Sequence, residues 1–382
     1  MPIATIEEAI EDLRQGRMIV LMDDKNRENE GDLCMAAEKV TPEAINFMAR
    51  FGRGLICLPM MEETVEQLGL TMMVSDNTSP FGTGFTVTID GVENVTTGIS
   101  ASDRAVTILA AIADDAKPQD LVTPGHMFPL QAKKGGVLVR AGQTEGSVDL
   151  ARLAGLRPAG VICEVMKDDG TMARLPDLEK FSAEHNLKLV TVPDLIQYRL
   201  KYDSLVFRAA SAQLPTRNGG DFEAVVYNTH IDQSEHLALV KGNILPDEDV
   251  LVRVHSKYVA GDVFGVDFQK PETRVILKRS MELIAGEGKG IILYLQIEGK
   301  GMGPIKKRQT PDRDFKDFGI GAQILRDLGV RKMRLLTNNP KNLVGLSGYG
   351  LEVTSCVPLE NQQTTQTTGD KRGKGKRSAR MS

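Results

Sequence analysis

Short apolar runs of strand length alternate with amphipathic segments of helix length along most of this chain. In the first half the apolar runs include MIVLM (18–22), GLICLPM (54–60) and AGVICEVM (159–166), and IEEAIEDL (6–13) repeats its apolar residues with the period of a helix. Because each kind of element buries one face, alternating strands and helices pack against one another in layers. The pattern therefore predicts an α/β (α+β) fold.

The length of 382 residues exceeds what one hydrophobic core usually organises, so we expect two domains. The alternation pauses near residues 198–203 and resumes with LVFRAASAQLPT (205–216). We therefore predict one mixed α/β domain over residues 1–203 and a second over residues 204–357. Residues 358–382 carry few large apolar side chains and much lysine, arginine, threonine and glycine, which predicts a flexible basic tail.

Composition excludes several classes of function. The net charge of -4 gives no general attraction to nucleic acid or to an anionic membrane. No apolar run approaches the roughly 20 residues that cross a bilayer, and the acidic start MPIATIEEAIEDL is unlike a signal peptide, so we expect a cytoplasmic protein. The cysteines are scattered, without the paired spacing of a zinc site or a disulfide framework, and are expected to be reduced thiols: Cys34, Cys57, Cys163 and Cys356.

A dense charged run follows the first apolar strand. DDKNRENEGD (23–32) lies between MIVLM and the apolar LCMAAEKV (33–40). A solvated loop is the ordinary explanation of such a run, but a loop held by strands at both ends is also where functional groups are mounted. Its five carboxylates repel one another unless a cation lies among them. Oxygen ligands suit a hard divalent cation such as magnesium, so the run predicts a metal-binding loop.

A second group of polar residues precedes a predicted helix. VLVR (137–140) reads as a strand and SVDLARLAG (147–155) as a helix, so Arg140, Gln143 and Thr144 are expected at the helix N-terminus. Free backbone N–H groups, the positive end of the helix dipole and a guanidinium together suit a phosphate group. The alternative is that Thr144 only caps the helix and that Arg140 is a surface charge.

Two further residues are candidates for proton transfer. Glu164 lies inside the apolar strand AGVICEVM, where a carboxylate must be paired, bound to a metal or protonated. A salt bridge to an arginine is the structural alternative for Glu164. His126 lies in PGHMFP, where two prolines stiffen the backbone, and is one of five histidines in the chain. For His126 the alternative is a packing role.

Taken together, these stretches resemble one enzyme family. DDKNRENEGD, TPGHMFPL, RAGQTEGSVDLARLAG and PAGVICEVMKDDGTMARLPDL are similar to 3,4-dihydroxy-2-butanone-4-phosphate synthase, over essentially all of residues 1–200. The resemblance implies a carbon–carbon lyase of riboflavin biosynthesis that converts D-ribulose 5-phosphate to L-3,4-dihydroxy-2-butanone 4-phosphate and formate. It also implies a magnesium or manganese cofactor and a homodimer that binds a small sugar phosphate.

The resemblance assigns roles to individual residues. It implies that His126 and Glu164 are catalytic and that Glu28 and Gln143 bind the metal. The substrate-binding set that it implies is Arg27, Glu28, Asp32, Arg140, Ala141, Gly142, Gln143, Thr144 and Glu164. Many family members have a histidine where this chain has Gln143. A glutamine carbonyl oxygen still ligates magnesium and is a harder ligand, so we expect retained activity with altered metal affinity.

The second half resembles GTP cyclohydrolase II over about residues 204–357. VLVRVHSKYVAGDVFG, YLQIEGKGMGP, DFGIGAQILRDLGV and MRLLTNNPKNLVGLSGYGLEV carry the likeness. That family holds a catalytic zinc ion with three cysteines. Here Tyr258 stands at the first position, and the stretch GVDFQKPE (265–272) supplies no cysteine. Without these ligands zinc cannot activate water, so we expect no zinc and no cyclohydrolase activity.

Other matched positions of the second half also differ. The glycine-rich loop reads EGKG (298–301), and Lys316 replaces the arginine that follows the family's aspartate, here Asp314. Lysine does not reproduce the bidentate contacts of a guanidinium. Arg253 and the stretch LLTNNP (335–340) are retained, which keeps nucleotide binding open. We therefore expect a regulatory or structural second domain.

Two alternatives stay open beside this interpretation. One is a bifunctional enzyme that also carries GTP cyclohydrolase II activity, against which the missing cysteines argue. The other is a binding or scaffold protein in which neither half turns over, and Gln143 is the one feature that supports it.

Overall fold

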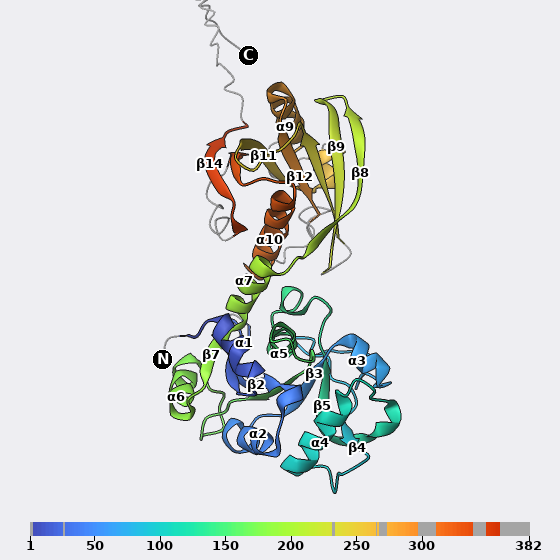
Figure 1. The fold of residues 1–382 in the computed structure, drawn as a ribbon, viewed down its shortest axis with the longest axis vertical. Coiled ribbons are helices and arrows are strands. Elements are labelled where there is room, and N and C mark those ends of the chain that lie inside the picture. Colours follow the sequence, from blue (N-terminus) through green and yellow to red (C-terminus); the bar gives the residue numbers. More distant parts are fainter. Residues whose placement is uncertain are drawn as a thin grey trace, which may run out of the picture.

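The computed structural model describes residues 3–25, 27–230, 234–264, 266, 273–296, 311–338 and 349–359. Two seven-stranded sheets organise these residues, and the chain completes the first sheet before it begins the second (Figure 1). Each sheet mixes parallel and antiparallel neighbours. The predicted pair of mixed α/β domains is confirmed, while the limits given above for each domain stay predictions.

The first sheet carries the predicted site. Its strands are β1 (Ile19–Met22), β2 (Gly31–Ala36), β3 (Cys57–Met60), β4 (Ile89–Gly91), β5 (Leu121–Gln131), β6 (Gly160–Glu164) and β7 (Lys188–Thr191). The helices of this half are α1 (Ile6–Arg14), α2 (Pro42–Phe47), α3 (Glu62–Gln67), α4 (Ala101–Ala111), α5 (Gln143–Leu153), α6 (Leu175–His185) and α7 (Val192–Tyr202). The strand order is β4-β5-β3-β6-β2-β1-β7, so the long β5 and the short β2 lie on either side of β3 and β6.

Helix α5 is enclosed by the rest of this half. All of its residues from Gln143 to Ala151 are buried. It packs on β1, β2, β3 and β6 and against α1 and α7. A Cβ atom on Gly146 would lie 2.8 Å from a methyl group of Leu21, so glycine allows the close approach of α5 to β1. A helix held on so many sides presents its N-terminus in a fixed position.

The start of α5 differs from the prediction. The stretch expected as the strand VLVR contains instead a short 3-10 helix, Gly136–Leu138. The backbone N–H of Val137 donates to the carboxylate of Asp149 at 2.8 Å instead of joining a strand ladder. Helix α5 begins before the predicted Ser147, with Gly142 as its N-cap. Thr144 is therefore a buried residue of the first turn, and its interpretation as the helix cap is wrong.

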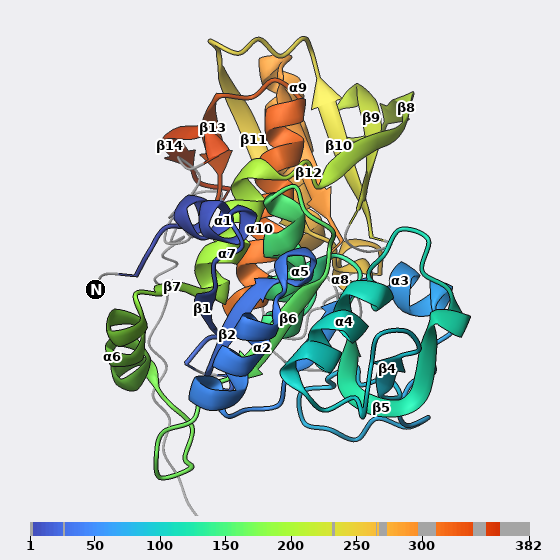
Figure 2. The same cartoon turned by 60° about the horizontal axis from the view of Figure 1, so that its bottom comes forward.

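The second sheet has the same number of strands and a different order. Its strands are β8 (Val206–Thr216), β9 (Gly220–Thr229), β10 (Glu235–Lys241), β11 (Asp249–Ser256), β12 (Gly290–Leu295), β13 (Lys332–Leu336) and β14 (Glu352–Val357). The helices of this half are α8 (Val259–Asp262), α9 (Thr273–Glu287) and α10 (Pro311–Asp327). The order is β14-β13-β11-β12-β10-β9-β8. The antiparallel β8 and β9 extend from one edge, and the parallel strands β11, β12 and β13 lie in the middle (Figure 2).

Several stretches named in the sequence analysis lie outside the described residues. These are the EGKG loop (298–301), GVDFQKPE (265–272) apart from Val266, and residues 360–382 of the expected tail. The side chains of Asp314 and Lys316 in α10 are likewise outside the description. No helix within the described ranges is both long and apolar enough to cross a membrane.

Helices α7 and α10 join the two halves (Figures 1 and 2). The amide of Gln323 on α10 donates to the carbonyl oxygens of Leu200 and Asp203, each at 2.8 Å. Its own oxygen accepts the backbone N–H of Leu205 at 2.8 Å. One side chain of the second half therefore pairs three backbone groups at and just after the end of the last helix of the first half.

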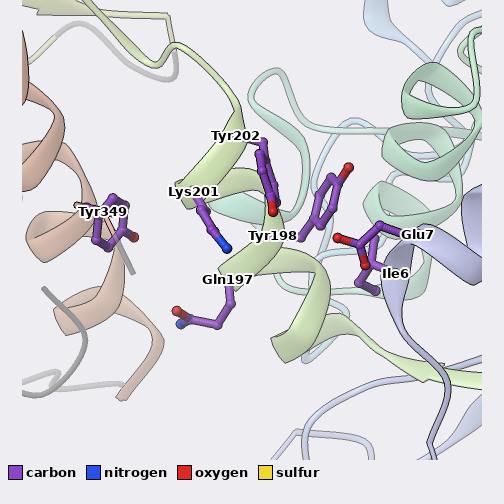
Figure 3. A pocket seen from close by; sticks show the side chains of 7 residues that line it. All are labelled: Ile6, Glu7, Gln197, Tyr198, Lys201, Tyr202 and Tyr349. Atoms are coloured by element: carbon purple, nitrogen blue, oxygen red, sulfur yellow. The ribbon is translucent and has the colours of Figure 1, made fainter. Parts of the chain in front are cut away.

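A small pocket of about 240 Å³ opens at this junction. Three of the six tyrosines of the chain line it, together with side chains of α1 and α7 (Figure 3). The lining residues are Ile6, Glu7, Gln197, Tyr198, Lys201, Tyr202 and Tyr349. Tyr198 and Tyr202 come from successive turns of α7, with ring centroids 4.6 Å apart.

Candidate active site

Asp23 organises the charged loop that follows β1. Its side chain is fully buried. Its two carboxylate oxygens accept the backbone N–H groups of Glu28 at 3.1 Å and of Glu30 at 2.9 Å. The guanidinium of Arg27 donates to the same carboxylate at 2.8 Å. A buried carboxylate with several donors is satisfied by the protein itself, so this loop is folded rather than merely solvated.

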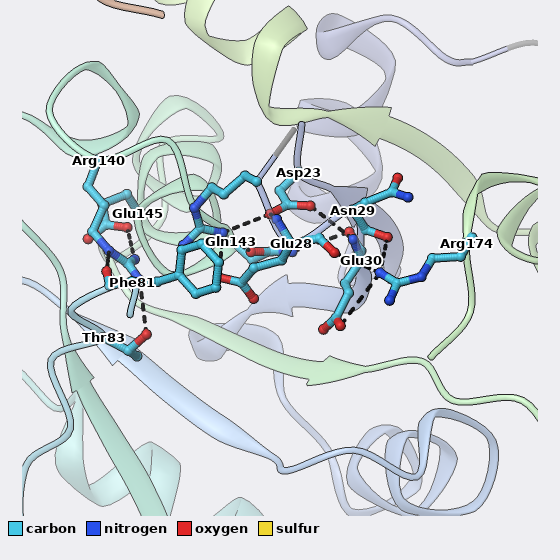
Figure 4. Close-up of polar contacts among 11 residues, drawn as sticks. Asp23, Glu28, Asn29, Glu30, Phe81, Thr83, Arg140, Gln143, Glu145 and Arg174 are labelled. Atoms are coloured by element: carbon cyan, nitrogen blue, oxygen red, sulfur yellow. Dashed lines mark hydrogen bonds and ion pairs between the residues drawn. The ribbon is translucent and has the colours of Figure 1, made fainter. Parts of the chain in front are cut away.

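One nitrogen atom of Arg27 joins the residues expected to bind a metal. Its Nη1 lies 2.7 Å from Oε1 of Glu28 and 3.2 Å from Oε1 of Gln143, besides its contact with Asp23. The amide nitrogen of Gln143 donates to the backbone carbonyl of Glu30 at 3.3 Å, which turns the amide oxygen toward Arg27. Asp23, Glu28 and Gln143 therefore gather around one cationic group (Figure 4).

Arg174, which precedes α6, holds the other side of the loop. Its Nη1 donates to the backbone carbonyls of Glu28 at 2.7 Å and Asn29 at 2.5 Å, and it lies 3.6 Å from the carboxylate of Glu30. Asn29 has a φ of 56°, in the left-handed region that asparagine tolerates better than most residues. The loop is thus held between Asp23 on the inside and Arg174 on the outside.

The N-terminus of α5 lies beside this loop. A Cβ atom on Gly142 would lie 2.8 Å from Nη1 of Arg140 and 3.0 Å from Nη2 of Arg27, so glycine leaves room for two guanidinium groups. Arg140 donates to the carboxylate of Glu145 at 2.6 Å and to the hydroxyl of Thr83 at 3.0 Å. Two oriented cations next to the free N–H groups of a helix suit a phosphate group.

Asp32 and Glu164 are directly opposite each other on β2 and β6. Burial, followed by the negative charge of Glu164, raises the pKa of Asp32 well above its usual range. Burial also raises the pKa of Glu164, although the backbone N–H of Leu55 donates to its carboxylate at 2.8 Å. Carboxyl groups with raised pKa values accept and donate protons closer to neutral pH, as general acid–base chemistry requires.

His126 is on β5, on the other side of β3 from Glu164 of β6. Strand β5 pairs in parallel with β3, and β3 pairs antiparallel with β6, in both cases through Cys57. Before Cys57 the register against β6 shifts, because Arg53 pairs with Val165 and the backbone N–H of Gly54 donates to the carbonyl of Glu164 at 3.2 Å. The strand order therefore places His126 and Glu164 on two strands of one sheet that are separated by β3.

A carboxylate orients the ring of His126. Its Nδ1 lies 2.7 Å from Oδ2 of Asp90, and its backbone N–H donates to Oδ1 of Asp90 at 2.9 Å. Asp90 is on β4 and is nearly buried, whereas the side chain of His126 is 43% exposed. A ring whose Nδ1–H is held by a carboxylate presents Nε2 as a proton acceptor. This geometry favours a catalytic role over a packing role.

The residues of the loop fit a magnesium or manganese ion. Oxygen atoms of Glu28 and Gln143 both reach the same cationic nitrogen, so both reach one point in space. Magnesium in proteins commonly takes one or two side-chain oxygens and completes its shell with water and substrate oxygens. Among the described residues, no group of three or more histidine, cysteine or acidic side chains is arranged as a metal site. Glu28 and Gln143 would therefore supply two oxygen ligands to such an ion.

The structure brings most of the sequence-predicted residues together. Arg27, Glu28 and Gln143 are in direct contact, and Arg140 and Thr144 lie beside them at the start of α5. The hydrogen bonds of His126 lead to β4 rather than to the loop.

Three residues that hold this site were missed in the sequence. Asp23 begins the charged run and could have been chosen as the first polar residue after a buried strand. Asp90 follows the apolar stretch GFTVTI but lies 36 positions before its partner His126. Arg174 is 146 positions after Glu28. No spacing rule connects residues so far apart.

The second half has a buried polar cluster around Tyr258, which stands where the resemblance implies the first zinc cysteine of the family. Asp262 accepts the backbone N–H of Tyr258 at 2.9 Å and the hydroxyl of Tyr294 at 2.7 Å, and it lies 3.0 Å from Nε2 of His255. Although burial acts in the opposite direction, these hydrogen bonds lower the pKa of Asp262 to about 2. Nε of Arg253 is buried without a partner among the described residues. A histidine already engaged by a carboxylate, without a thiolate, does not fit the three-cysteine zinc site.

Two known families match the two halves of the chain. Residues 7–198 match 3,4-dihydroxy-2-butanone 4-phosphate synthase, and residues 207–358 match GTP cyclohydrolase II. The riboflavin biosynthesis protein RibBA of Aquifex aeolicus is 56% identical over 93% of this chain and 92% of its own length. The bifunctional riboflavin biosynthesis protein RIBA 1 of Arabidopsis thaliana is 48% identical over 97% of this chain and 73% of its own length.

Solved structures agree with the match of the first half. RibBX from A. baumannii, described as a two-domain 3,4-dihydroxy-2-butanone 4-phosphate synthase, is 42% identical over 93% of this chain and 99% of its own, with a TM-score of 0.75. A 3,4-dihydroxy-2-butanone 4-phosphate synthase in complex with two magnesium ions is 40% identical over 52% of this chain and 98% of its own, with a TM-score of 0.51.

Proposed function

The chain is an enzyme of the 3,4-dihydroxy-2-butanone 4-phosphate synthase family of riboflavin biosynthesis, and we propose that it converts D-ribulose 5-phosphate to L-3,4-dihydroxy-2-butanone 4-phosphate and formate. The observation that carries this proposal is the contact of Arg27 with Glu28 and Gln143 beside the N-terminus of α5. A sugar phosphate needs an oxygen-lined cation site and a phosphate site within a few ångströms of each other, and this corner supplies both.

The residues divide the chemistry between them. Arg27, Arg140 and the N–H groups of α5 bind the phosphate and fix the sugar's direction along the sheet. Glu28 and Gln143 would hold a divalent ion, and its chemistry when bound would be to polarise the carbonyl and hydroxyl oxygens of the sugar. Glu164 takes a proton from carbon to form an enediol, and Asp32, which burial keeps protonated more readily than usual, returns protons to oxygen.

His126, oriented by Asp90, serves as a second general base. The atoms balance without an oxidant or a second substrate, because five carbons become a four-carbon phosphate and formate. The protein's task is therefore to move protons and hold one conformation of the sugar.

One assay tests this proposal. Metal-stripped full-length protein is incubated with D-ribulose 5-phosphate and magnesium, and formate and the four-carbon phosphate are followed by NMR. Equal amounts of the two products support the proposal. Turnover by Glu164→Gln equal to that of the unaltered protein contradicts the role given to Glu164.

We further propose that the second half supports the first without cyclohydrolase activity. Tyr258 stands in place of the first zinc cysteine of the family. The carboxylate of Asp262 binds Tyr258, His255 and Tyr294 beside it, so these polar groups are already paired. Gln323 meanwhile pairs backbone groups at the end of α7. These contacts favour a structural role for this half.

The comparisons favour a second candidate over an inactive second half, namely GTP cyclohydrolase II activity. Residues 207–358 match that family, and the relative from Arabidopsis thaliana is called bifunctional. The sequence between Glu164 and Cys356 contains no cysteine, which is the argument against it. Elemental analysis of dialysed protein and a GTP assay with added zinc decide between the two. About one zinc ion per chain together with formate and pyrophosphate from GTP establishes the bifunctional enzyme.

Two further properties belong to this proposal. The first is a homodimer, which light scattering after size exclusion tests as a mass of twice 41.7 kDa. The second is a cytoplasmic location, which the four free cysteines favour because thiols persist in reducing compartments. No nucleic-acid or membrane partner is proposed, since the net charge of -4 supplies no attraction to either.

A further inference from the structure

Glu28 and Gln143, the residues proposed to bind the metal, already share a cationic partner. Nη1 of Arg27 lies 2.7 Å from the Glu28 carboxylate and 3.2 Å from the Gln143 amide oxygen. The side chain of Arg27 is 15% exposed, and Gln143 is buried. Contacts so poorly reached by solvent are weakly screened, so they hold the guanidinium in place.

A guanidinium and a divalent cation compete for these oxygens. The side chain of Gln143 has a single oxygen atom, and its nitrogen is tied to the carbonyl of Glu30, which keeps that oxygen directed toward Arg27. A divalent ion bound to Glu28 and Gln143 would also lie within a few ångströms of the Arg27 guanidinium in a poorly solvated place, where the repulsion between the two positive charges is strong. Metal binding is therefore expected to displace Arg27.

We propose that Arg27 is a resident cation of the metal site, which competes with the divalent ion for Glu28 and Gln143 and lowers its affinity. This inference rests on the proposed metal site. In this role Arg27 neutralises the carboxylates of Asp23 and Glu28 when no metal is bound.

The displaced guanidinium has a destination. Nη2 of Arg27 already lies near Gly142, beside Arg140 at the start of α5. Asp23 keeps two backbone N–H donors, from Glu28 and Glu30, when Arg27 leaves, so the loop retains its shape. Metal binding therefore frees a cation at the place where a phosphate group would bind. The metal and an anionic ligand are expected to favour each other's binding.

The test measures manganese binding by electron paramagnetic resonance, with metal-stripped full-length protein and without substrate. Arg27→Ala is expected to bind manganese about fivefold to tenfold more tightly than the unaltered protein, because a competing ion pair is removed. Arg27→Lys keeps the charge, so its manganese affinity is expected to lie between those of the unaltered protein and Arg27→Ala. Glu28→Gln identifies the site, since its loss of carboxylate charge is expected to weaken binding at least about tenfold.

Arg174→Ala is the matched control. It removes an equal charge that contacts the same loop from outside, but Arg174 donates to backbone carbonyls and lies near the carboxylate of Glu30 rather than near Gln143. We expect a change of less than about twofold. Circular dichroism verifies that each variant is folded, and Arg27→Lys keeps the test valid if Arg27→Ala unfolds.

The outcomes separate this inference from the proposed function. Manganese binding by Arg27→Ala that is no tighter than in the unaltered protein overturns the competition. An equal gain in manganese affinity in Arg174→Ala overturns it too, as does the absence of manganese binding in every variant. A protein that releases no formate yet shows the Arg27-specific gain keeps the inference and loses the function. A protein that releases formate without this gain keeps the function alone.

Discussion

Asp32 of β2 and Glu164 of β6 are direct cross-strand partners, two carboxyl groups facing each other in one antiparallel pair. Like charges in such positions destabilise a sheet, and here Asp32 is also buried. Burial first, and the charge of Glu164 second, raise the pKa of Asp32 well above its usual range. The pair is therefore expected to lower the unfolding free energy of the protein, while its raised pKa values suit proton transfer.

Asp32→Asn is predicted to stabilise the protein and to abolish most of its synthase activity. A folded-state pKa above the unfolded value of about 3.9 means that the native state holds this proton more tightly. The contribution of this proton to the unfolding free energy is fully present below about pH 4, and it is lost as pH rises through the raised pKa of the folded state. Each unit of the shift corresponds to about 1.4 kcal/mol of unfolding free energy. The gain in Asp32→Asn should therefore be larger at pH 8 than at pH 5.

Calorimetry in the presence of EDTA measures this gain at both pH values. Asp168→Asn is the control, because that side chain is 97% exposed and its change is expected to stay within about 0.5 kcal/mol. A gain that does not depend on pH, or a less stable Asp32→Asn at pH 8, contradicts the account of the pair.

The roles proposed for the site residues predict a hierarchy of rates. Glu28→Ala, His126→Ala and Glu164→Ala are each expected to lower kcat at least about a hundredfold, as loss of a metal ligand or an acid–base group does. Asp90→Asn leaves the imidazole present but loosens its orientation, so a smaller loss of about tenfold is expected, with KM for ribulose 5-phosphate unchanged. Steady-state kinetics separate the two parameters. An Asp90→Asn variant with normal kcat shows that the contact is only structural.

Gln143→His is predicted to retain activity and to bind manganese about twofold to tenfold more tightly. Imidazole is a good manganese ligand, and the substitution removes the amide oxygen that accepts from Arg27. Gln143→Leu has similar volume and no ligand atom, so it serves as the negative control. Titration of metal-stripped protein measures both variants, and metal affinity that is equal in Gln143→Leu and the unaltered protein removes Gln143 from the site.

Gln323→Ala is predicted to lower stability without changing the chemistry. The variant leaves the N–H of Leu205 and the carbonyl oxygens of Leu200 and Asp203 without their partner, which corresponds to a loss of about 1 to 3 kcal/mol in unfolding free energy. Synthase kcat at 25 °C should stay within about twofold. The midpoint of thermal inactivation reports the loss, and Gln213→Ala on the exposed strand β8 is the control. An unchanged midpoint shows that the junction does not support the first half.

The fragment 1–203 is a second test of the same relationship. It contains every residue proposed to take part in synthesis, so it is expected to be active with magnesium and less stable than the full chain. A folded fragment without activity shows that the second half contributes to the reaction itself.

Much of the site could be predicted because its residues are close together in the chain. The charged run and the apolar strands on either side of it are local patterns, and β1 and β2 form where periodicity places them. The start of α5 could not be predicted, because the side chain of Asp149, far along the helix, takes the N–H of Val137 and prevents a strand there.

The long-range partners were also beyond local patterns. Strand β5 contains Pro124 and Pro129, which disfavour a regular strand, yet it forms between β3 and β4 and carries His126. The pairing of His126 with Asp90 and of Asp32 with Glu164 depends on the strand order, which a single sequence does not specify. Function was accessible from the sequence because the motifs identify a family, whereas the electrostatics of the site required the fold.

Formate release from D-ribulose 5-phosphate by metal-stripped full-length protein, recorded before and after magnesium is added, tests the central claim most directly. The account predicts no formate before the addition, and afterwards formate and four-carbon phosphate in equal amounts. Folded protein that releases no formate with magnesium, or that releases it equally well in EDTA, contradicts the account.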